Sequence, residues 1–267
     1  MENFLNYQGK KIFYKKIGSG NAVLLVHGFG EAGNIWDHQI ETLKNNYQVI
    51  IPDLPGTGQS ELIDDMSLEG MVEVLHDLIH ELDIDSITIL GHSMGGYITL
   101  AFVEKYYNHV HAFGLIHSSS YADNDEKIIS RKKGIEHIKK HGAENFLTTT
   151  AANLFSTSTK ETKPDVIKKY TDSLSQFSAD SLIKYYEAMM ARKDRTNILS
   201  NTHSPVLFII GEHDQAVPPS DSLEQSHLPQ ISFIHMMSAS GHMSMIEEPI
   251  KCNEAIAEFL KTVYVND

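Results

Sequence analysis

The fold is decided by the stretch ITILGHSMGGYITLAFV, which runs from Ile87 to Val103. A short apolar, β-branched run comes first, a glycine-rich turn around Ser93 follows, and an apolar helical pattern begins directly after it. This order matches G-x-S-x-G in the strand, turn and helix context that the motif requires. The glycines are needed because side chains at their positions would collide with the strand and the helix behind the turn. Ser93 is therefore predicted to stand out above a sheet.

Two backbone N–H groups are candidates for stabilising an oxyanion beside Ser93. The helix that begins after Ser93 directs the positive end of its dipole toward developing negative charge, so the N–H of Met94 is the natural first donor. The predicted strand Ala22–Val26 leads into the loop His-Gly-Phe-Gly, and we expect the N–H of Phe29 to be the second donor. Two donors matter because the tetrahedral intermediate of acyl transfer places a full charge on oxygen.

A serine hydroxyl is a poor nucleophile until a base takes its proton, so one of the 15 histidines must reach Ser93. His242 lies in a loop of small residues between the last predicted strand and the last predicted helix. Asp214 follows the apolar run Val206–Ile210, and the chain order Ser, Asp, His is typical of this motif. The aspartate would hold the imidazole tautomer and stabilise the imidazolium. Glu212 is the nearest alternative acid.

The rest of the chain alternates between apolar β-branched runs and amphipathic helical patterns. The clearest helical pattern runs from Ser67, a predicted N-cap, to Leu82. This alternation predicts a mainly parallel sheet with helices on both faces, and residues 11–16 are a candidate antiparallel edge. The further predicted strands are Val49–Ile51, Phe113–Ile116 and Ile231–Ile234, and a last helix is predicted at about 247–263.

The alternation stops between residues 118 and 201. No strong strand pattern occurs there, and helical patterns follow one another around 128–140, 144–155, 164–176 and 180–191. We therefore predict a core domain formed by 1–117 and 202–267, and a helical lid inserted between them at 118–201.

Composition restricts the partners and the compartment. The 267 residues are 41% hydrophobic and 21% charged, which is ordinary for a globular protein, and the formal charge of -13 argues against nucleic acid as a partner. A single cysteine, Cys252, allows no internal disulfide framework. The N-terminal stretch lacks the apolar core of a signal peptide, and no apolar run approaches the roughly 20 residues that span a bilayer. We expect a soluble, cytoplasmic protein that does not act at a membrane.

Two other patterns point to different chemistry and are disfavoured. Gly28, Gly30 and Gly33 form G-x-G-x-x-G after a strand, and Asp53 lies 20 residues further on, which is the spacing of a dinucleotide site. That reading leaves the serine turn, the acid and the late histidine unexplained, and Asp53 has a simpler role as a turn residue.

The second pattern is the pair His76 and His80, which has metal-ligand spacing on a helix. Both histidines lie off the apolar stripe of that helix, among acidic residues, so a solvated surface is favoured. We expect neither a metal nor a cofactor.

Taken together, these residues resemble the α/β-hydrolase superfamily, and within it the small, lid-bearing serine esterase, lactonase and carbon–carbon hydrolase group. The motifs that carry the resemblance are HGFG from His27, DLPGTGQS from Asp53, GHSMGG from Gly91, GEHD from Gly211 and GH from Gly241. The resemblance implies the α/β-hydrolase fold and acyl-enzyme chemistry without a cofactor. It assigns the catalytic triad to Ser93, Asp214 and His242 and the oxyanion hole to Phe29 and Met94. Serine at position 93 argues against dehalogenase and epoxide hydrolase activity, which use aspartate there.

The resulting hypothesis is a carboxylesterase-like serine hydrolase that acts on a small ester, thioester or lactone, as a monomer or a homodimer. Alternatives are a triad-based lyase or carbon–carbon bond hydrolase, and a ligand receptor with weak hydrolysis. The apolar and soft side chains of the predicted lid favour a medium-sized, largely apolar acyl group. They are Leu154, Phe155, Tyr185, Tyr186, Met189 and Met190.

Overall fold

The computed structural model describes residues 2–174 and 177–265. Its centre is an eight-stranded sheet in the order β1-β2-β4-β3-β5-β6-β7-β8. The pairs β1·β2 and β2·β4 are antiparallel, and all the other neighbouring strands are parallel. The strands are β1 (Glu2–Tyr7), β2 (Lys10–Ile17), β3 (Ala22–Val26), β4 (Gln48–Pro52), β5 (Ile87–His92), β6 (Val110–Ile116), β7 (Val206–Gly211) and β8 (Ser232–Met237). The predicted α/β-hydrolase fold is confirmed.

The sheet is covered on both faces, and each buried strand supplies side chains to both layers. Leu24 and Val26 of β3 belong to the core beneath α2 and α3, whereas Val23 and Leu25 belong to the core beneath α1 and α12. This alternation follows from the two-residue period of a strand. The covering elements are η1 (Gly33–Trp36), α1 (Asp37–Leu43), α2 (Leu68–Glu81), α3 (Met94–Tyr106), η2 (Tyr107–His109), α10 (Pro219–Gln225), α11 (Ser244–Glu247) and α12 (Pro249–Tyr264).

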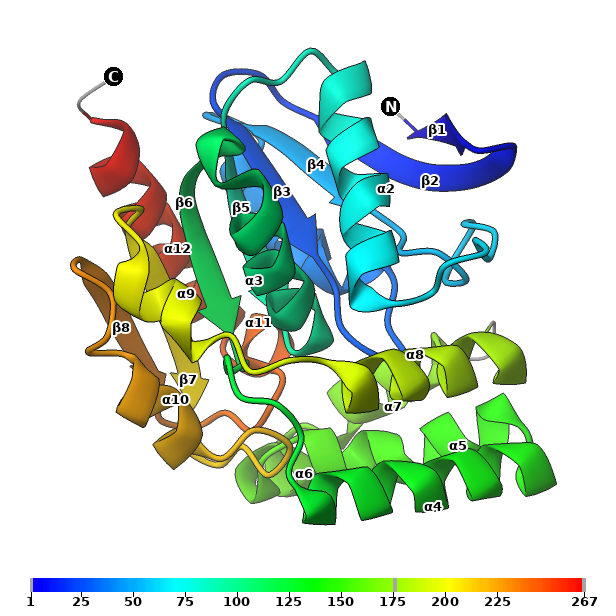
Figure 1. Cartoon of the computed structure of the whole chain (residues 1–267). Coiled ribbons are helices and arrows are strands. Elements are labelled where there is room, and N and C mark those ends of the chain that lie inside the picture. The colour runs from blue at the N-terminus through cyan, green and yellow to red at the C-terminus, as the bar shows by residue number, and fades with distance from the viewer. Residues whose placement is uncertain (1, 175–176, 266–267) are drawn as a thin grey trace.

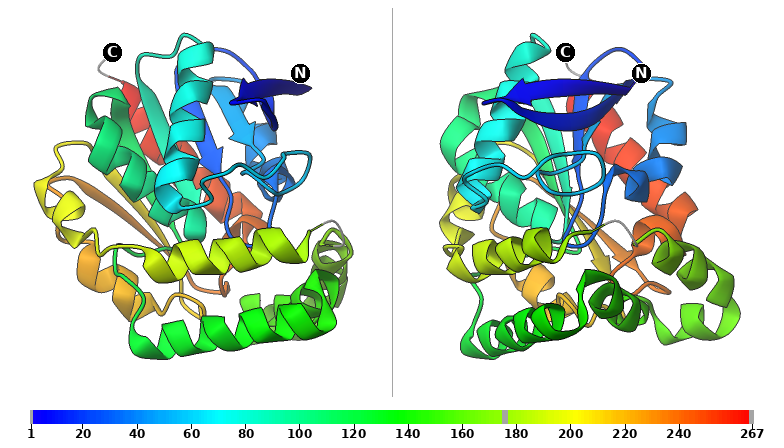
Figure 2. Two further views of the ribbon diagram at one scale, coloured as in Figure 1. Left: turned by 45° about the vertical axis from the view of Figure 1, so that its right-hand side comes forward. Right: turned by 90° about the vertical axis from the view of Figure 1, so that its right-hand side faces the viewer.

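The predicted helical insertion is present between β6 and β7. It lies across the carboxyl ends of the parallel strands, whereas the chain ends lie toward the opposite end of the sheet (Figures 1 and 2). Its elements are α4 (Asp125–His141), α5 (Ala143–Thr150), η3 (Ala151–Leu154), α6 (Thr157–Thr162), α7 (Pro164–Asp172), α8 (Ala179–Ala191) and α9 (Thr196–Asn201). We keep 118–201 as the predicted bounds of the insertion.

Several element boundaries differ from the sequence-based prediction. The strand β1 was not predicted; it pairs with β2 through a tight turn in which Gln8 and Gly9 both have positive φ, 50° and 82°. The predicted helix 144–155 is α5 followed by the 3₁₀ helix η3. The predicted helix 164–176 ends as α7 at Asp172, and positions 175–176 lie outside the described residues.

None of the helices in the described ranges combines the length and the apolar character that crossing a bilayer requires.

Candidate active site

Ser93 lies at the sharp turn between β5 and α3. Its φ and ψ are 52° and −116°, a strained conformation that non-glycine residues rarely adopt, and Gly91 and Gly95 flank it. The N–H of Ser93 donates to the carbonyl of Ile116 at 2.9 Å, and its carbonyl accepts from the Ser118 hydroxyl at 2.8 Å. The turn is therefore anchored to the end of β6, and it holds Ser93 at the carboxyl edge of the sheet.

Gly95 is needed because α3 packs directly on the end of β3. A Cβ atom at this position would lie 2.3 Å from the carbonyl oxygen of Val26 and 2.7 Å from that of His27. Alanine normally stabilises a helix relative to glycine, but here it would force α3 off the sheet. We expect Gly95→Ala to lower the free energy of unfolding by about 2 to 3 kcal/mol, measured as a fall in the thermal unfolding midpoint. A variant as stable as the wild type would contradict this packing.

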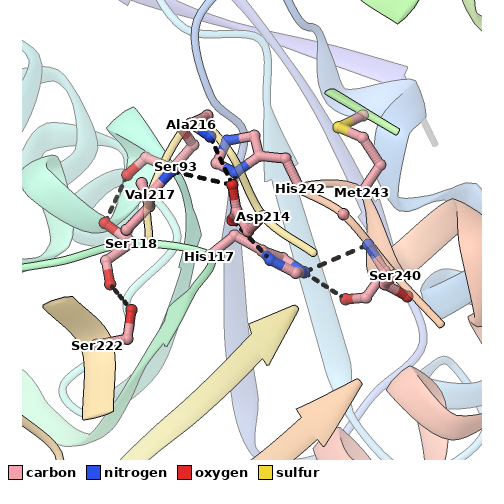
Figure 3. A network of polar contacts seen from close by, with 12 residues as sticks. Ser93, His117, Ser118, Asp214, Ala216, Val217, Ser222, Ser240, His242 and Met243 are labelled. Atoms are coloured by element: carbon pink, nitrogen blue, oxygen red, sulfur yellow. Dashed lines mark hydrogen bonds and ion pairs between the residues drawn. The ribbon is translucent and has the colours of Figure 1, made fainter. Parts of the chain in front are cut away.

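Asp214 and His242 form a buried pair beyond the ends of β7 and β8. His242 Nδ1 lies 2.7 Å from Asp214 Oδ2, and the other carboxylate oxygen accepts the N–H groups of Ala216 and Val217 at 2.8 and 2.9 Å. Figure 3 shows this pair in one cluster with Ser93. Because Asp214 binds Nδ1, the Nε2 atom of the imidazole is the one left for a proton from a nucleophile. Glu212, the alternative acid, is exposed to solvent.

Asp214 and His242 each shift the pKa of the other. Burial would raise the pKa of Asp214, but the charge and hydrogen bonds of His242 and His117 hold that pKa well below its ordinary range. Burial would lower the pKa of His242, but the charge and hydrogen bond of Asp214, together with the charges of Glu31 and Glu247, outweigh burial and raise that pKa above 6.5. A buried aspartate that stays ionised is what an imidazolium-stabilising acid requires.

The raised pKa of His242 predicts a pH dependence. A general base works only when unprotonated, so activity should rise with pH as His242 loses its proton. We expect the acid limb of the kcat/KM profile to lie above 6.5, the ordinary pKa of histidine. A limb below that value would mean that Asp214 does not control the base.

The loop after β3 reaches Ser93, as an oxyanion loop must. A Cβ atom on Gly28 would lie 3.1 Å from the Cβ of Ser93, and the N–H of Gly28 itself donates to Glu31 Oε2 at 2.6 Å. The next N–H, that of Phe29, and the N–H of Met94, the first residue of α3, remain our candidates for the oxyanion hole. The side chain of Phe29 stacks on Tyr186 of α8, with ring centroids 4.3 Å apart.

A buried pair of side chains, Glu31 and His92, connects the loops of the candidate site and was not predicted from the sequence. The ring of His92 contacts Glu31 Oε2 through Nδ1 at 2.9 Å and the carbonyl of His242 through Nε2 at 2.9 Å. Both side chains are fully buried. Burial would raise the pKa of Glu31, but the charge and hydrogen bond of His92, with the N–H of Gly28 and the charge of His27, together lower it. The pair thus joins the candidate oxyanion loop, the turn at Ser93 and the loop of His242. The only signal in the sequence was the residue before Ser93, which the motif G-x-S-x-G leaves unspecified.

Two more buried residues support the candidate triad and were also missed: one contacts Asp214, and the other binds the backbone beside His242. His117, directly after β6, contacts Asp214 at 3.1 Å. Glu247 of α11 accepts the N–H of Gly241 at 2.8 Å, next to His242 in the chain. Neither residue belongs to a motif, so only the folded chain identifies them.

The residues of the dinucleotide pattern serve the turn instead. Asp53 Oδ1 accepts the N–H of Gly33 at 2.8 Å, and Asp53 Oδ2 accepts the N–H of Gln59 at 3.0 Å. The carboxylate thus joins the loops after β3 and β4.

The histidine pair with metal-ligand spacing lies on α2. His76 stacks on Tyr106, and His80 is exposed to solvent.

Three buried groups in the described part of the chain have the spacing of a metal site. Ligand atoms of His117, Asp214 and His242 lie within 4.8 Å of one another. In both histidines Nδ1 faces the same aspartate oxygen, so a cation between them would have to displace both hydrogen bonds. The arrangement suits proton transfer without a metal.

A cavity of about 680 Å³ lies between α7 and the loops after β3 and β4. It borders the oxyanion loop at Glu31, and its walls include Ile35, Tyr170 and Leu174. Ser93, Asp214 and His242 are not among its lining residues. The candidate triad therefore lies outside the lining of this cavity.

With this fold and geometry, the chain belongs to a known family: residues 21–249 match the family model described as alpha/beta hydrolase fold. The chain is 26% identical over 264 residues to 3-oxoadipate enol-lactonase 1 of Acinetobacter baylyi, covering 97% of this chain and 96% of that relative. It is also 26% identical to 2-hydroxy-6-oxo-6-(2'-aminophenyl)hexa-2,4-dienoic acid hydrolase of Metapseudomonas resinovorans, covering 97% and 91% of the two chains. Among solved structures, a thermophilic esterase from Thermogutta terrifontis matches with a TM-score of 0.92 and 27% identity, covering 99% of each chain.

Proposed function

We propose that the protein is a serine hydrolase that cleaves small carboxylic esters or lactones through an acyl-enzyme on Ser93. The observation that carries the proposal is the buried Asp214–His242 pair, 2.7 Å apart, at the sheet edge that also presents the strained Ser93. The similarity to an enol-lactonase and an esterase supports this substrate class. Thioesters fall within the same chemistry.

In the first half-reaction His242 Nε2 takes the proton of the Ser93 hydroxyl while Oγ bonds to the carbonyl carbon. The carbonyl π electrons move to oxygen, and the N–H groups of Phe29 and Met94 stabilise that charge. When the intermediate collapses, the bond to the leaving alcohol breaks, and the alcohol oxygen takes the proton from His242. An ester thus yields an acyl-enzyme and a free alcohol.

In the second half-reaction water replaces the alcohol. His242 removes a proton from the water as its oxygen attacks the acyl carbon, and the same two N–H groups hold the second oxyanion. Ser93 then leaves and recovers its proton from His242, which releases a carboxylic acid. With a lactone the alcohol and acid belong to one molecule, so the product is a hydroxy acid.

The wall formed by the insertion is apolar near the candidate oxyanion hole. Phe29 packs against Tyr186, and Phe146 contacts both rings edge to face at 6.4 and 5.9 Å. Such aromatic surfaces bind apolar groups through burial rather than hydrogen bonding. We therefore infer that the acyl group is largely apolar.

The first test needs no knowledge of the substrate. Purified protein is treated with a fluorophosphonate probe, which reacts with activated serines, and its intact mass is measured. We expect one label on the wild type and none on Ser93→Ala. A wild-type protein that is folded but unlabelled would contradict the proposal.

A substrate panel then separates hydrolysis of esters from other uses of the triad. Aryl esters, thioesters and lactones with acyl chains of increasing length are compared with a vinylogous diketone that reports carbon–carbon cleavage. Faster turnover of esters or lactones supports the proposal. Cleavage of the diketone alone would assign the triad to carbon–carbon chemistry.

A further inference from the structure

Two histidines donate to the same oxygen of the candidate catalytic acid. Asp214 Oδ2 lies 2.7 Å from Nδ1 of His242 and 3.1 Å from Nδ1 of His117 (Figure 3). Both rings are buried, and their centroids are 5.5 Å apart. With the N–H groups of Ala216 and Val217 on Oδ1, the carboxylate accepts four hydrogen bonds. A triad requires only one of these, the bond from His242.

The contacts of His117 determine which of its nitrogens carries the proton. Its Nε2 faces the backbone N–H of Ser244 at 3.3 Å and the hydroxyl of Ser244 at 2.7 Å. A backbone N–H can only donate, so Nε2 accepts and Nδ1 carries the hydrogen that reaches Asp214. His117 is therefore a neutral donor.

Burial keeps the ring of His117 neutral. Charged or titratable side chains face it from three sides: Asp214 after β7, His242 after β8 and His92 at the end of β5. Burial lowers the pKa of His117 to about 4, although Asp214 pulls it upward. The neutral ring thus adds a hydrogen bond to Asp214 without neutralising its charge.

The backbone conformation of His117 places its ring against Asp214. Its φ is 49°, in the left-handed region that few residues other than glycine adopt and in which His, Asn and Asp are found more often than the rest. Its N–H donates to the carbonyl of Ile209 at 2.9 Å. A Cβ atom on Gly211 would lie 2.8 Å from the ring of His117, so the neighbouring strand end leaves room for the imidazole. Strain of this kind persists where surrounding contacts over-determine the conformation.

We propose that His117 is a positioning residue of the active site, which fixes the Asp214 carboxylate and moderates its hold on the base His242 by sharing Oδ2. This role rests on the proposed hydrolase function. A second donor withdraws negative charge from Oδ2 and prevents the carboxylate from rotating. Without it, Asp214 would attract the imidazolium form of His242 more strongly, and less of the base would be free near neutral pH.

The test compares His117→Asn with His117→Leu. The two side chains have nearly the same size, and Asn places its amide N–H at the same number of bonds from Cβ as Nδ1 of histidine, whereas Leu has no donor. For Leu we expect the acid limb of kcat/KM to move up by about half a pKa unit or more, with kcat about ten-fold lower and KM within about two-fold. For Asn we expect a limb close to the wild type and a smaller loss of kcat. A folded Leu variant with an unshifted limb would overturn the proposal.

Nuclear magnetic resonance of the histidine rings separates this proposal from the proposed function. The pKa of His242 is measured in the wild type and the Leu variant, so the shift is observable whether or not an ester is cleaved. Wild-type hydrolysis with no shift would leave the hydrolase proposal intact and remove the role of His117. If the Leu variant does not fold, the wild-type spectrum decides: an Nδ1–H tautomer of His117 that persists while His242 titrates supports the proposal, and an Nε2–H tautomer overturns it.

Discussion

Ser93→Ala is expected to lower kcat by about 10⁴-fold or more while leaving the fold intact. The hydroxyl oxygen is the atom that would bond to the acyl carbon, and alanine offers no replacement. The backbone strain is unchanged, because alanine has the same Cβ as serine and meets the same turn at φ 52°. The measurement is turnover of the best ester in the panel, with thermal unfolding as the check on folding.

A matched control is available on the insertion. Ser158 of α6 is exposed, so Ser158→Ala makes the same chemical change away from the triad and should keep wild-type activity. If Ser93→Ala were folded and still active within about ten-fold, Ser93 would not be the nucleophile, and another group or a water molecule would have to attack the carbonyl.

The fold was predicted well because each strand and each covering helix has its own local pattern of apolar residues and glycines in the sequence. The run Ile87–Leu90 followed by Gly91 and Gly95 is enough to place a strand, a turn and a helix, and the structure places β5 and α3 there. The strand β1 was missed because it pairs with β2 through a turn at Gln8 and Gly9, in which both residues have positive φ. The usual sequence signal for such a turn is Asn-Gly, and Gln-Gly does not carry it.

The candidate site was only partly predictable, for a physical reason. Ser93, Asp214 and His242 each follow a strand, and the carboxyl ends of parallel strands meet at one edge, so the sequence brings them together. No comparable rule predicts the residues that support these three side chains. Glu31, His92, His117 and Glu247 are buried polar groups, and which partner each one binds depends on loops that meet only after folding.

Glu247 provides the largest expected effect on stability. Its Oε1 accepts the N–H groups of Gly241 and Met243 at 2.8 and 3.3 Å, on either side of His242. Its Oε2 accepts the N–H of Ser156 at 2.9 Å and the hydroxyl of Thr159 at 2.7 Å, both in the insertion. One buried carboxylate therefore ties the loop of the base to the segment that covers the site.

We expect Glu247→Leu to lower the free energy of unfolding by about 3 to 5 kcal/mol, because it leaves several buried donors without an acceptor. Glu247→Gln should cost less. Its amide oxygen can still accept from the loop of His242, and the hydroxyl of Thr159 can turn to accept from the amide N–H, but the N–H of Ser156 loses its acceptor. Thermal unfolding measures both variants, and Glu254→Gln, at an exposed position of α12, is the matched control.

The kinetic effect of Glu247→Gln should come mainly from a change in the position of the His242 loop and less from the loss of the negative charge. The N–H of His242 also donates to the carbonyl of Leu154 at 2.7 Å, so the insertion holds the base through its backbone as well. Freeing one side of this connection would displace His242 from Ser93, and a displacement of about 1 Å can lower kcat by about a hundred-fold. We therefore expect Glu247→Gln to lower kcat and to move the acid limb only slightly downward, because the charge of Glu247 raises the pKa of His242 less than Asp214 does. A variant that keeps wild-type kcat would show that the position of the base does not depend on the insertion.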